Sequence, residues 1–143
     1  MERLVSPMAE RPRNILICSC EDTVPLDSEM VRRACRDSVV IEGRQFCRTE
    51  LERLRKALAG GEPVTVACTQ EAPLFNEIAQ EVEGAGAVSF VNIRETAGWT
   101  KDSAKTGPKI AALIAASLEP VSEIPFVPLK SDGVTLLYGK MSG

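Results

Sequence analysis

The chain has 143 residues, of which 44% are hydrophobic and 26% charged, and its formal net charge is −3. These values are typical of one globular domain with a proper core, and the acidic balance argues against a nucleic-acid or anionic-membrane partner, which would need a basic face. The sequence contains no histidine. This absence excludes Ser-His-Asp and Cys-His nucleophile pairs and every zinc site with a histidine ligand.

The sequence carries no targeting or membrane signal that we recognise. No apolar run approaches the roughly 18 residues of a membrane-spanning helix, and the opening segment, MERLVSPMAERPRN, has no apolar stretch typical of a secretory signal. We therefore expect a cytoplasmic protein, in which thiols stay reduced. Its five cysteines are then expected to be metal ligands, redox groups or core residues rather than disulfides.

Strand and helix signals alternate along the chain after a polar leader, residues 1–13, that contains two prolines. Short β-branched runs predict buried strands, and apolar residues at helical spacing predict helices between them. The expected strands are 14–18, 38–41, 64–67 and 87–92, and the expected helices are 26–35, 49–59, 73–83 and one that includes 110–118.

Helix ends are marked by capping residues. Asp27 or Ser28 is expected to cap the first helix. Thr49-Glu50-Leu51-Glu52 predicts a capping box at the start of the second helix, which Gly60-Gly61 is expected to end.

This alternation predicts an α/β domain over residues 14–118. We expect three layers, a Rossmann-like, four-stranded, mainly parallel sheet with helices on both faces. Its functional crevice should lie beyond the carboxyl ends of the strands. Residues 119–143 begin with the Pro-rich stretch EPVSEIPFVPLKSDG, which predicts a linker, and VTLLYGK then resembles the first strand of a following domain. We therefore expect the chain to be the N-terminal piece of a longer protein.

Four of the five cysteines are predicted to meet at one edge of that sheet. Cys18 and Cys20 stand at the end of the first strand, Cys47 in the loop after the second, and Cys68 directly after the third. Four convergent thiolates suit an iron–sulfur cluster, and they equally suit zinc in an all-thiolate site. Cys35 lies on the apolar face of a helix near the opposite edge, so we interpret it as a core residue.

Other interpretations of the cysteines stay open. Free cysteine often behaves as a small buried hydrophobe, and Cys18 is the weakest ligand candidate because it lies within a strand. Cys18 and Cys20 are also suited to a reducible disulfide in a thiol–disulfide redox module. A phosphatase loop from Cys47 to Arg53 is disfavoured because two glutamates within it would repel phosphate, and no Gly-rich loop follows the first strand to bind a nucleotide.

Four segments, ILICSCEDT, QFCRTE, VACTQEAPLF and FVNIRETAGW, together resemble the N-terminal domain of A-type heterodisulfide reductase proteins and related bacterial polyferredoxin-type iron–sulfur proteins. The resemblance covers about residues 14–118. It implies a 4Fe–4S cluster on Cys18, Cys20, Cys47 and Cys68, in an electron-transfer chain with ferredoxin-like domains and redox partner proteins. No catalytic residue is expected in this segment.

One departure from the resemblance concerns charge. Where archaeal relatives have CHCG this chain has CSCE, so Glu21 would place a negative charge beside an already anionic cluster. Arg48 and Arg94, expected at the same edge, are candidates to offset it, and Arg94 is therefore predicted to contact the cofactor. Trp99 is expected either to shield the site from water or to pack the sheet edge.

Overall fold

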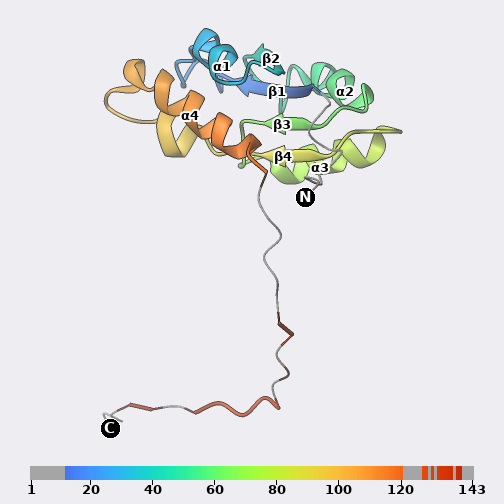
Figure 1. Ribbon diagram of the computed structural model, residues 1–143, viewed down its shortest axis with the longest axis vertical. Helices are drawn as coiled ribbons and strands as arrows, with labels where there is room; N and C mark the ends of the chain where they lie inside the picture. The colour runs from blue at the N-terminus through green and yellow to red at the C-terminus, as the bar shows by residue number, and fades with distance from the viewer. Residues whose placement is uncertain (1–11, 121–126, 129, 131, 137, 140–143) are drawn as a thin grey trace, which may run out of the picture.

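Four parallel strands form one sheet in the computed structural model, which describes residues 12–120, 127–128, 130, 132–136 and 138–139. The sheet has the strand order β2-β1-β3-β4, which Figure 1 shows side by side. In chain order the strands are β1 (Arg13–Cys18), β2 (Ser38–Gly43), β3 (Val64–Val66) and β4 (Val88–Phe90). On β1, Leu16 stands opposite Ile41 of β2 and Val66 of β3, so the first strand lies inside the sheet. The predicted parallel sheet is confirmed.

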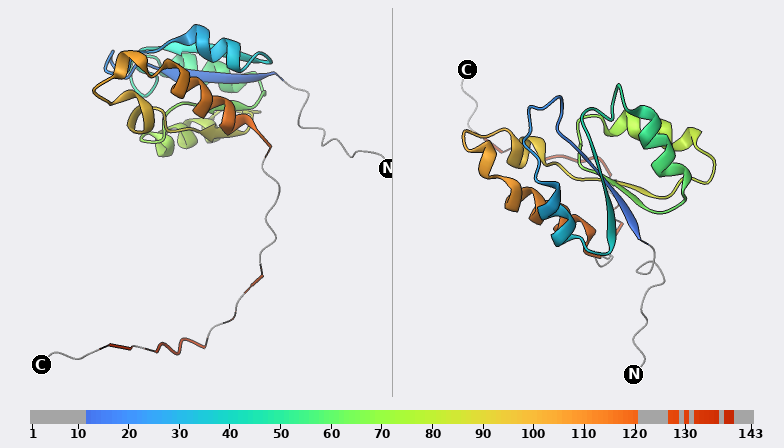
Figure 2. Two further views of the ribbon diagram at one scale, coloured as in Figure 1. Left: turned by 60° about the vertical axis from the view of Figure 1, so that its left-hand side comes forward. Right: turned by 90° about the horizontal axis from the view of Figure 1, so that it is seen from above.

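Helices cover both faces of the sheet, which confirms the predicted three-layer α/β fold. In the right-hand view of Figure 2, α1 and α4 lie on one side and α2 and α3 on the other. The bounds are α1 (Ser28–Ala34), α2 (Leu51–Ala59), α3 (Ala72–Glu81) and α4 (Gly107–Leu118). Between β4 and α4 the chain forms a π-helical turn, η2 (Arg94–Gly98), and a short 3-10 turn, η3 (Ser103–Lys105).

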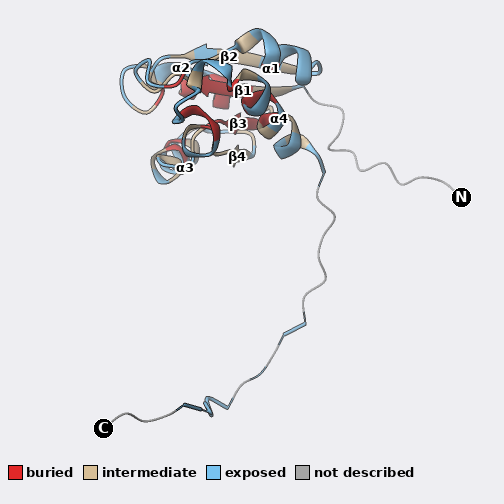
Figure 3. Cartoon of the chain, turned by 90° about the vertical axis from the view of Figure 1, so that its left-hand side faces the viewer, coloured by how far each residue is buried: buried red, intermediate tan, exposed pale blue. Residues whose placement is uncertain are grey.

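The hydrophobic core has one part on each face of the sheet. Successive side chains of a strand point to opposite faces, and β1 accordingly sends Ile15 and Ile17 to the α1–α4 side and Leu16 to the α2–α3 side. All three are fully buried, and Figure 3 shows the buried residues concentrated in the sheet. Cys35 belongs to the first part of the core and is 5% exposed, as predicted.

Gly60 is the C-cap of α2, as predicted, and the two predicted N-terminal caps have different outcomes. Asp27 caps α1, where its Oδ1 accepts a hydrogen bond of 3.0 Å from the backbone N–H of Met30. The capping box at Thr49 is wrong, because α2 begins at Leu51 after an N-cap residue, Glu50, that makes no side-chain cap. The Oε2 atom of Glu50 instead accepts from the backbone N–H groups of Arg44 and Gln45, which precede it in the loop.

The ends of the chain lie largely outside the described residues. This holds for most of the predicted leader, residues 1–13, and for much of the predicted linker and following strand, residues 119–143. Among the described residues near the C-terminus, Val134, Leu136 and Tyr138 are 90%, 89% and 100% exposed, and the following domain stays a prediction. Across the described part of the chain, no helix is long and apolar enough to cross a membrane.

Candidate functional site

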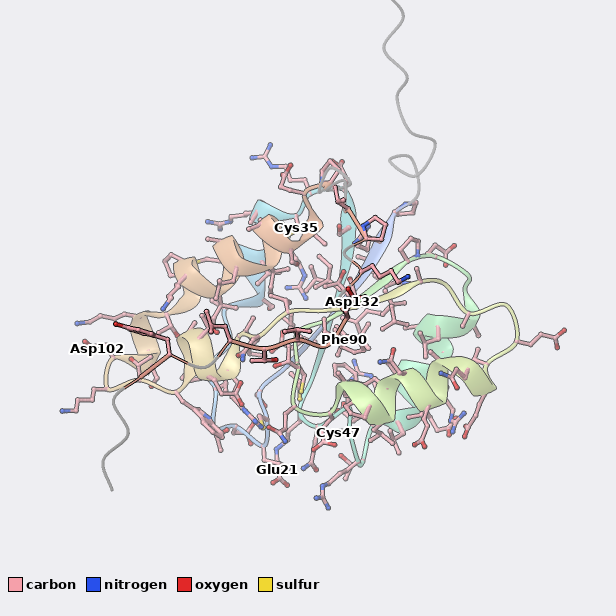
Figure 4. The ribbon with its side chains drawn as sticks, turned by 90° about the horizontal axis from the view of Figure 1, so that it is seen from below. Glu21, Cys35, Cys47, Phe90, Asp102 and Asp132 are labelled. Atoms are coloured by element: carbon pink, nitrogen blue, oxygen red, sulfur yellow. The ribbon has the colours of Figure 1, made fainter. Side chains whose placement is uncertain are left out.

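A cavity of about 310 Å³ opens at the carboxyl ends of the first three strands, and we call it the cysteine cavity. Its wall includes Cys18, Cys20, Cys47, Cys68 and Arg94, which are the five residues that the sequence pattern indicates. Cys35 is not part of it. Figure 4 shows Glu21 and Cys47 at one end of the domain and Cys35 at the other. The structure thus brings the four cysteines together from three separate connections.

The cavity crosses the edge of the sheet. Cys20 packs against the core on the α1–α4 side, whereas Cys18, Cys47 and Cys68 pack against the core on the α2–α3 side. All four are partly buried free thiols, so no disulfide joins them. The cavity lies just beyond the strand ends, where the sheet no longer separates its two faces. Side chains from both faces therefore reach it.

Cys18 ends β1 with its sulfur held by the backbone. Its Sγ donates to the carbonyl oxygen of Arg44 at 3.0 Å and accepts from the backbone N–H of Cys20 at 3.4 Å. Burial raises the pKa of the Cys18 thiol, and the nearby sulfurs of Cys20 and Cys68 act in the same direction. Binding a metal or cluster here must therefore displace a proton, because the thiolate is the ligand form.

Cys20 begins a turn with three successive residues in the left-handed region. The φ angles of Cys20, Glu21 and Asp22 are 50°, 58° and 66°. None of them is glycine, and this conformation costs an L-residue about 1–2 kcal/mol. The turn is held by a hydrogen bond of 3.0 Å between the Ser19 hydroxyl and Asp22, and by an ion pair of 2.7 Å between Asp22 and Arg44. Strained turns of this kind occur preferentially at functional sites.

The loop that carries Cys47 turns tightly between β2 and α2. A Cβ atom at Gly43 would lie 2.5 Å from the ring of Phe46, which is fully buried, so glycine is required there. The Glu50 carboxylate accepts from the backbone N–H groups of Arg44 at 2.5 Å and of Gln45 at 2.6 Å. Although burial opposes its ionisation, these bonds and the neighbouring Arg53 lower the pKa of Glu50.

Cys47 shares the cavity wall with a negatively charged neighbour, Glu71. Burial raises the pKa of its thiol, and the carboxylate of Glu71 raises it further. The cavity wall thus includes two acids, Glu21 and Glu71, and two bases, Arg48 and Arg94. Sequence reasoning missed Glu71, and its position directly before α3, three residues after Cys68, is the signal that places it at the same edge.

Arg94 makes the one side-chain hydrogen bond to a cysteine sulfur within the described residues. Its Nη1 lies 3.4 Å from Cys20 Sγ, although the two residues are 74 positions apart. Its Nε also donates to Glu95 at 2.8 Å, and the guanidinium carbon lies 4.4 Å from the centroid of the Trp99 ring. The bonds to Cys20 and Glu95 raise the pKa of Arg94. Arg94 is thus held from three sides.

Trp99 directly follows η2 and contacts both Arg94 and Thr23, and its role as a shield or as packing of the sheet edge stays a prediction. Its ring covers Arg94, its Nε1 donates to Thr23 Oγ1 at 3.2 Å, and the residue is 53% exposed. One face of the ring therefore covers the guanidinium that bonds Cys20.

The π-helical turn η2 positions Arg94 and Trp99 together. The backbone N–H of Trp99 donates to the carbonyl of Arg94 at 2.8 Å, five residues back, and such turns often occur at functional sites. A Cβ at Gly98 would lie 2.6 Å from Val24 Cγ1. The glycine thus lets η2 approach the loop after β1 that carries Cys20.

The described residues contain no group of three or more cysteine, aspartate or glutamate side chains close enough to hold a single metal ion. The four sulfurs share a cavity without forming a ready-made mononuclear site.

No protein-family model matches the chain, and no curated protein or solved structure shows a significant similarity to it. The resemblance to the heterodisulfide reductase domain therefore stays a prediction.

Proposed function

We propose that this domain binds a 4Fe–4S cluster through Cys18, Cys20, Cys47 and Cys68 and acts as an electron-transfer module. The observation that supports the proposal is the shared cavity: four of the five cysteines line it, and the fifth, Cys35, is buried elsewhere. Thiolates are the ligands that iron–sulfur clusters require.

The cavity suits a small inorganic group. Its volume of about 310 Å³ lies at the lower end of the range for ligand pockets, about 300–1,000 Å³. Buried apolar side chains, Phe46 and Phe75, form part of its wall and would limit the access of water. When bound, a 4Fe–4S cluster supplies a one-electron redox couple.

The protein's own residues have separate tasks in this proposal. The four cysteines supply thiolates, and the left-handed turn and the Gly43–Glu50 loop hold two of them at the cavity wall. Arg94 opposes the negative charge that the thiolates and Glu21 bring. No described residue is assigned a catalytic role.

The proposed setting follows from the sequence. We propose a cytoplasmic protein in which this domain exchanges electrons with ferredoxin-like domains of a longer chain and with redox partner proteins. The exposed edge at which the cavity opens is compatible with such exchange, since electron transfer needs the two redox groups to approach one another.

Anaerobic reconstitution tests the proposal. The purified chain is incubated with ferrous iron, sulfide and a thiol reductant, desalted, and analysed for iron and acid-labile sulfide, with EPR spectra after dithionite reduction. We expect about four irons and four sulfides per chain, as the cluster type requires. Cys20→Ser and Cys68→Ser should lose most of this iron, whereas the matched control Cys35→Ser should retain it.

Two other outcomes identify the alternatives. Stoichiometric zinc that resists exchange for iron and is lost in the same two variants would identify a structural four-cysteine zinc site. Failure to take up either metal, with a Cys18–Cys20 disulfide that forms and is reduced reversibly, would identify a thiol–disulfide redox module. Either result would refute the cluster proposal.

A further inference from the structure

We infer that Arg94 raises the reduction potential of a cluster bound in the cysteine cavity. Its guanidinium, fixed by Glu95 and Trp99, stabilises the reduced form of a cluster bound to Cys20. This inference rests on the proposed function and adds to it a residue that controls the potential. It assigns to Arg94 a positioning and electrostatic role, not a ligand role.

The contact between Arg94 and Cys20 is the first basis for this role. Arg94 Nη1 lies 3.4 Å from Cys20 Sγ, within reach of an N–H···S hydrogen bond. Hydrogen bonds to the sulfurs, net charge and solvent exposure are the levers by which a protein tunes an iron–sulfur potential. An N–H donor on a ligand sulfur favours the more negative, reduced state and therefore raises the potential.

Arg94 is also held in place rather than merely nearby. Nε and Nη2 both donate to Glu95 Oε1, and the guanidinium lies 4.4 Å from the centroid of the Trp99 ring. The Arg94 side chain is 19% exposed. A guanidinium that is oriented in advance and shielded from water acts on a nearby charge more strongly than one in solvent.

The charge balance around Arg94 can be altered in both directions. The Glu95 carboxylate binds the guanidinium and cancels part of its positive charge. The backbone N–H of Glu95 is itself bound to Asn92 Oδ1 at 3.1 Å, so Glu95 is also held in place. Removing the charge of Arg94 should lower the potential, and removing the charge of Glu95 should raise it.

Arg48 provides a matched control. It lines the same cavity and carries the same charge, but among the described residues only Arg94 bonds a cysteine sulfur through its side chain, and Arg48 is exposed. If charge alone mattered, Arg48 and Arg94 would have similar effects. If the oriented N–H···S bond matters, Arg94 should have a much larger effect, because an exposed charge is screened by water and salt.

The electron balance of the redox step is simple. Reduction transfers one electron from a one-electron donor, here dithionite through mediator dyes, and no covalent bond forms or breaks. The site gains one negative charge, and Arg94 keeps its proton because a guanidinium does not deprotonate in proteins.

The experiment is an EPR-monitored redox titration of the reconstituted chain at pH 7 and fixed ionic strength. Arg94→Met should shift the midpoint potential to a more negative value by at least about 59 mV. For one electron, this corresponds to a tenfold change in the ratio of reduced to oxidised protein. Arg48→Met should shift it much less. Glu95→Gln, which keeps an amide oxygen for Arg94, should shift it to more positive potential.

A fluorescence measurement checks the contact without any cluster. Trp99 is the only tryptophan, so the emission of the cluster-free protein reports on the ring that covers Arg94. Arg94→Met should change the intensity and wavelength of this emission, whereas Arg48→Met should not.

The outcomes separate the inference from the proposed function. A wild-type chain that takes up no iron and sulfide would overturn both. A loaded chain in which Arg94→Met and Arg48→Met shift the potential equally would overturn the role of Arg94 alone. If Arg94→Met fails to load, Glu95→Gln still decides the matter, because an unchanged or lowered potential in that variant refutes the proposed charge balance.

Discussion

Gly98 packs against Val24, and this contact joins the turn that carries Arg94 to the loop that carries Cys20. The effect of disturbing the contact on the free energy of unfolding can be estimated. A Cβ at position 98 would lie 2.6 Å from Val24 Cγ1 and 3.0 Å from Cγ2. Both residues are buried, with Val24 1% exposed. Gly98→Ala therefore has to displace Val24 or η2, and we expect it to destabilise the protein.

The magnitude follows from opposing contributions. Overpacking of a core costs about 1–3 kcal/mol. Gly98 does not have a positive φ, so alanine restricts the unfolded chain and thereby offsets about 0.4–1 kcal/mol of this loss. We expect a net loss of about 1–2 kcal/mol in the free energy of unfolding. Val24→Ala removes two buried methyl groups, each worth about 0.8 kcal/mol, and leaves a cavity, so its loss should be about 2–3 kcal/mol.

The double variant tests the contact itself. In Val24→Ala/Gly98→Ala the new methyl group occupies space that the valine left, so the combined loss should be smaller than the sum of the two by about 1–2 kcal/mol. Urea unfolding of the cluster-free protein, followed by Trp99 fluorescence, gives all four free energies. Because distant sites add within about 0.5 kcal/mol, simple additivity would show that Val24 and Gly98 do not touch.

Three further predictions concern the loops around the cavity. Glu50→Ala should lower the free energy of unfolding by about 1–3 kcal/mol, because two backbone N–H groups lose a charged acceptor. Urea unfolding should show a much smaller loss for the exposed control Glu52→Ala, and equal losses would contradict this role. Glu21→Asn should stabilise the fold by about 0.5–1 kcal/mol, since asparagine tolerates the left-handed region better; a loss in thermal unfolding would argue against that turn. Burial raises the pKa of Cys18 and Cys47 above that of an unfolded cysteine, which is about 8.5, so the folded state keeps these protons longer, and stability should fall as the pH rises above about 8.5. The free energy of unfolding, measured by urea titration at pH values from about 7 to 10, should fall less steeply with pH in the serine variants of these two cysteines. An unchanged slope would count against the burial of their thiols.

Part of the candidate site was predictable because it depends on chain order alone. Cys18, Cys47 and Cys68 each follow or end a strand, and parallel strands all end at the same edge of their sheet. Their convergence in one cavity therefore follows from the alternation of strands and helices. Cys35 could also be distinguished from the cysteines of the cavity by sequence, because helical spacing places it on a buried face.

The local geometry of the loops was not predictable, because distant backbone groups determine it. Thr49-Glu50-Leu51-Glu52 has the letters of a capping box, yet the Glu50 carboxylate binds N–H groups of Arg44 and Gln45 that the tight turn at Gly43 brings near. Likewise, Asp22 is the one residue from Cys20 to Asp22 of a type enriched in the left-handed region, and a single aspartate does not indicate three such residues in succession. Bonds to the loop after β2, such as Glu21 N–H to the Arg44 carbonyl at 3.0 Å, hold it there.

Hydrophobic periodicity and chain order were enough to predict the parallel α/β fold, the edge at which four thiols meet and the burial of the fifth, because these follow from the order and the apolar pattern of the elements along the chain. The contact of Arg94, rather than Arg48, with a sulfur could be read only from the folded molecule, and so could the hydrogen bond of Trp99 to Thr23. Those pairings join loops 74 and 76 residues apart. They depend on how closely the two loops approach each other. Packing at Gly98 determines that approach, and no local sequence pattern indicates it.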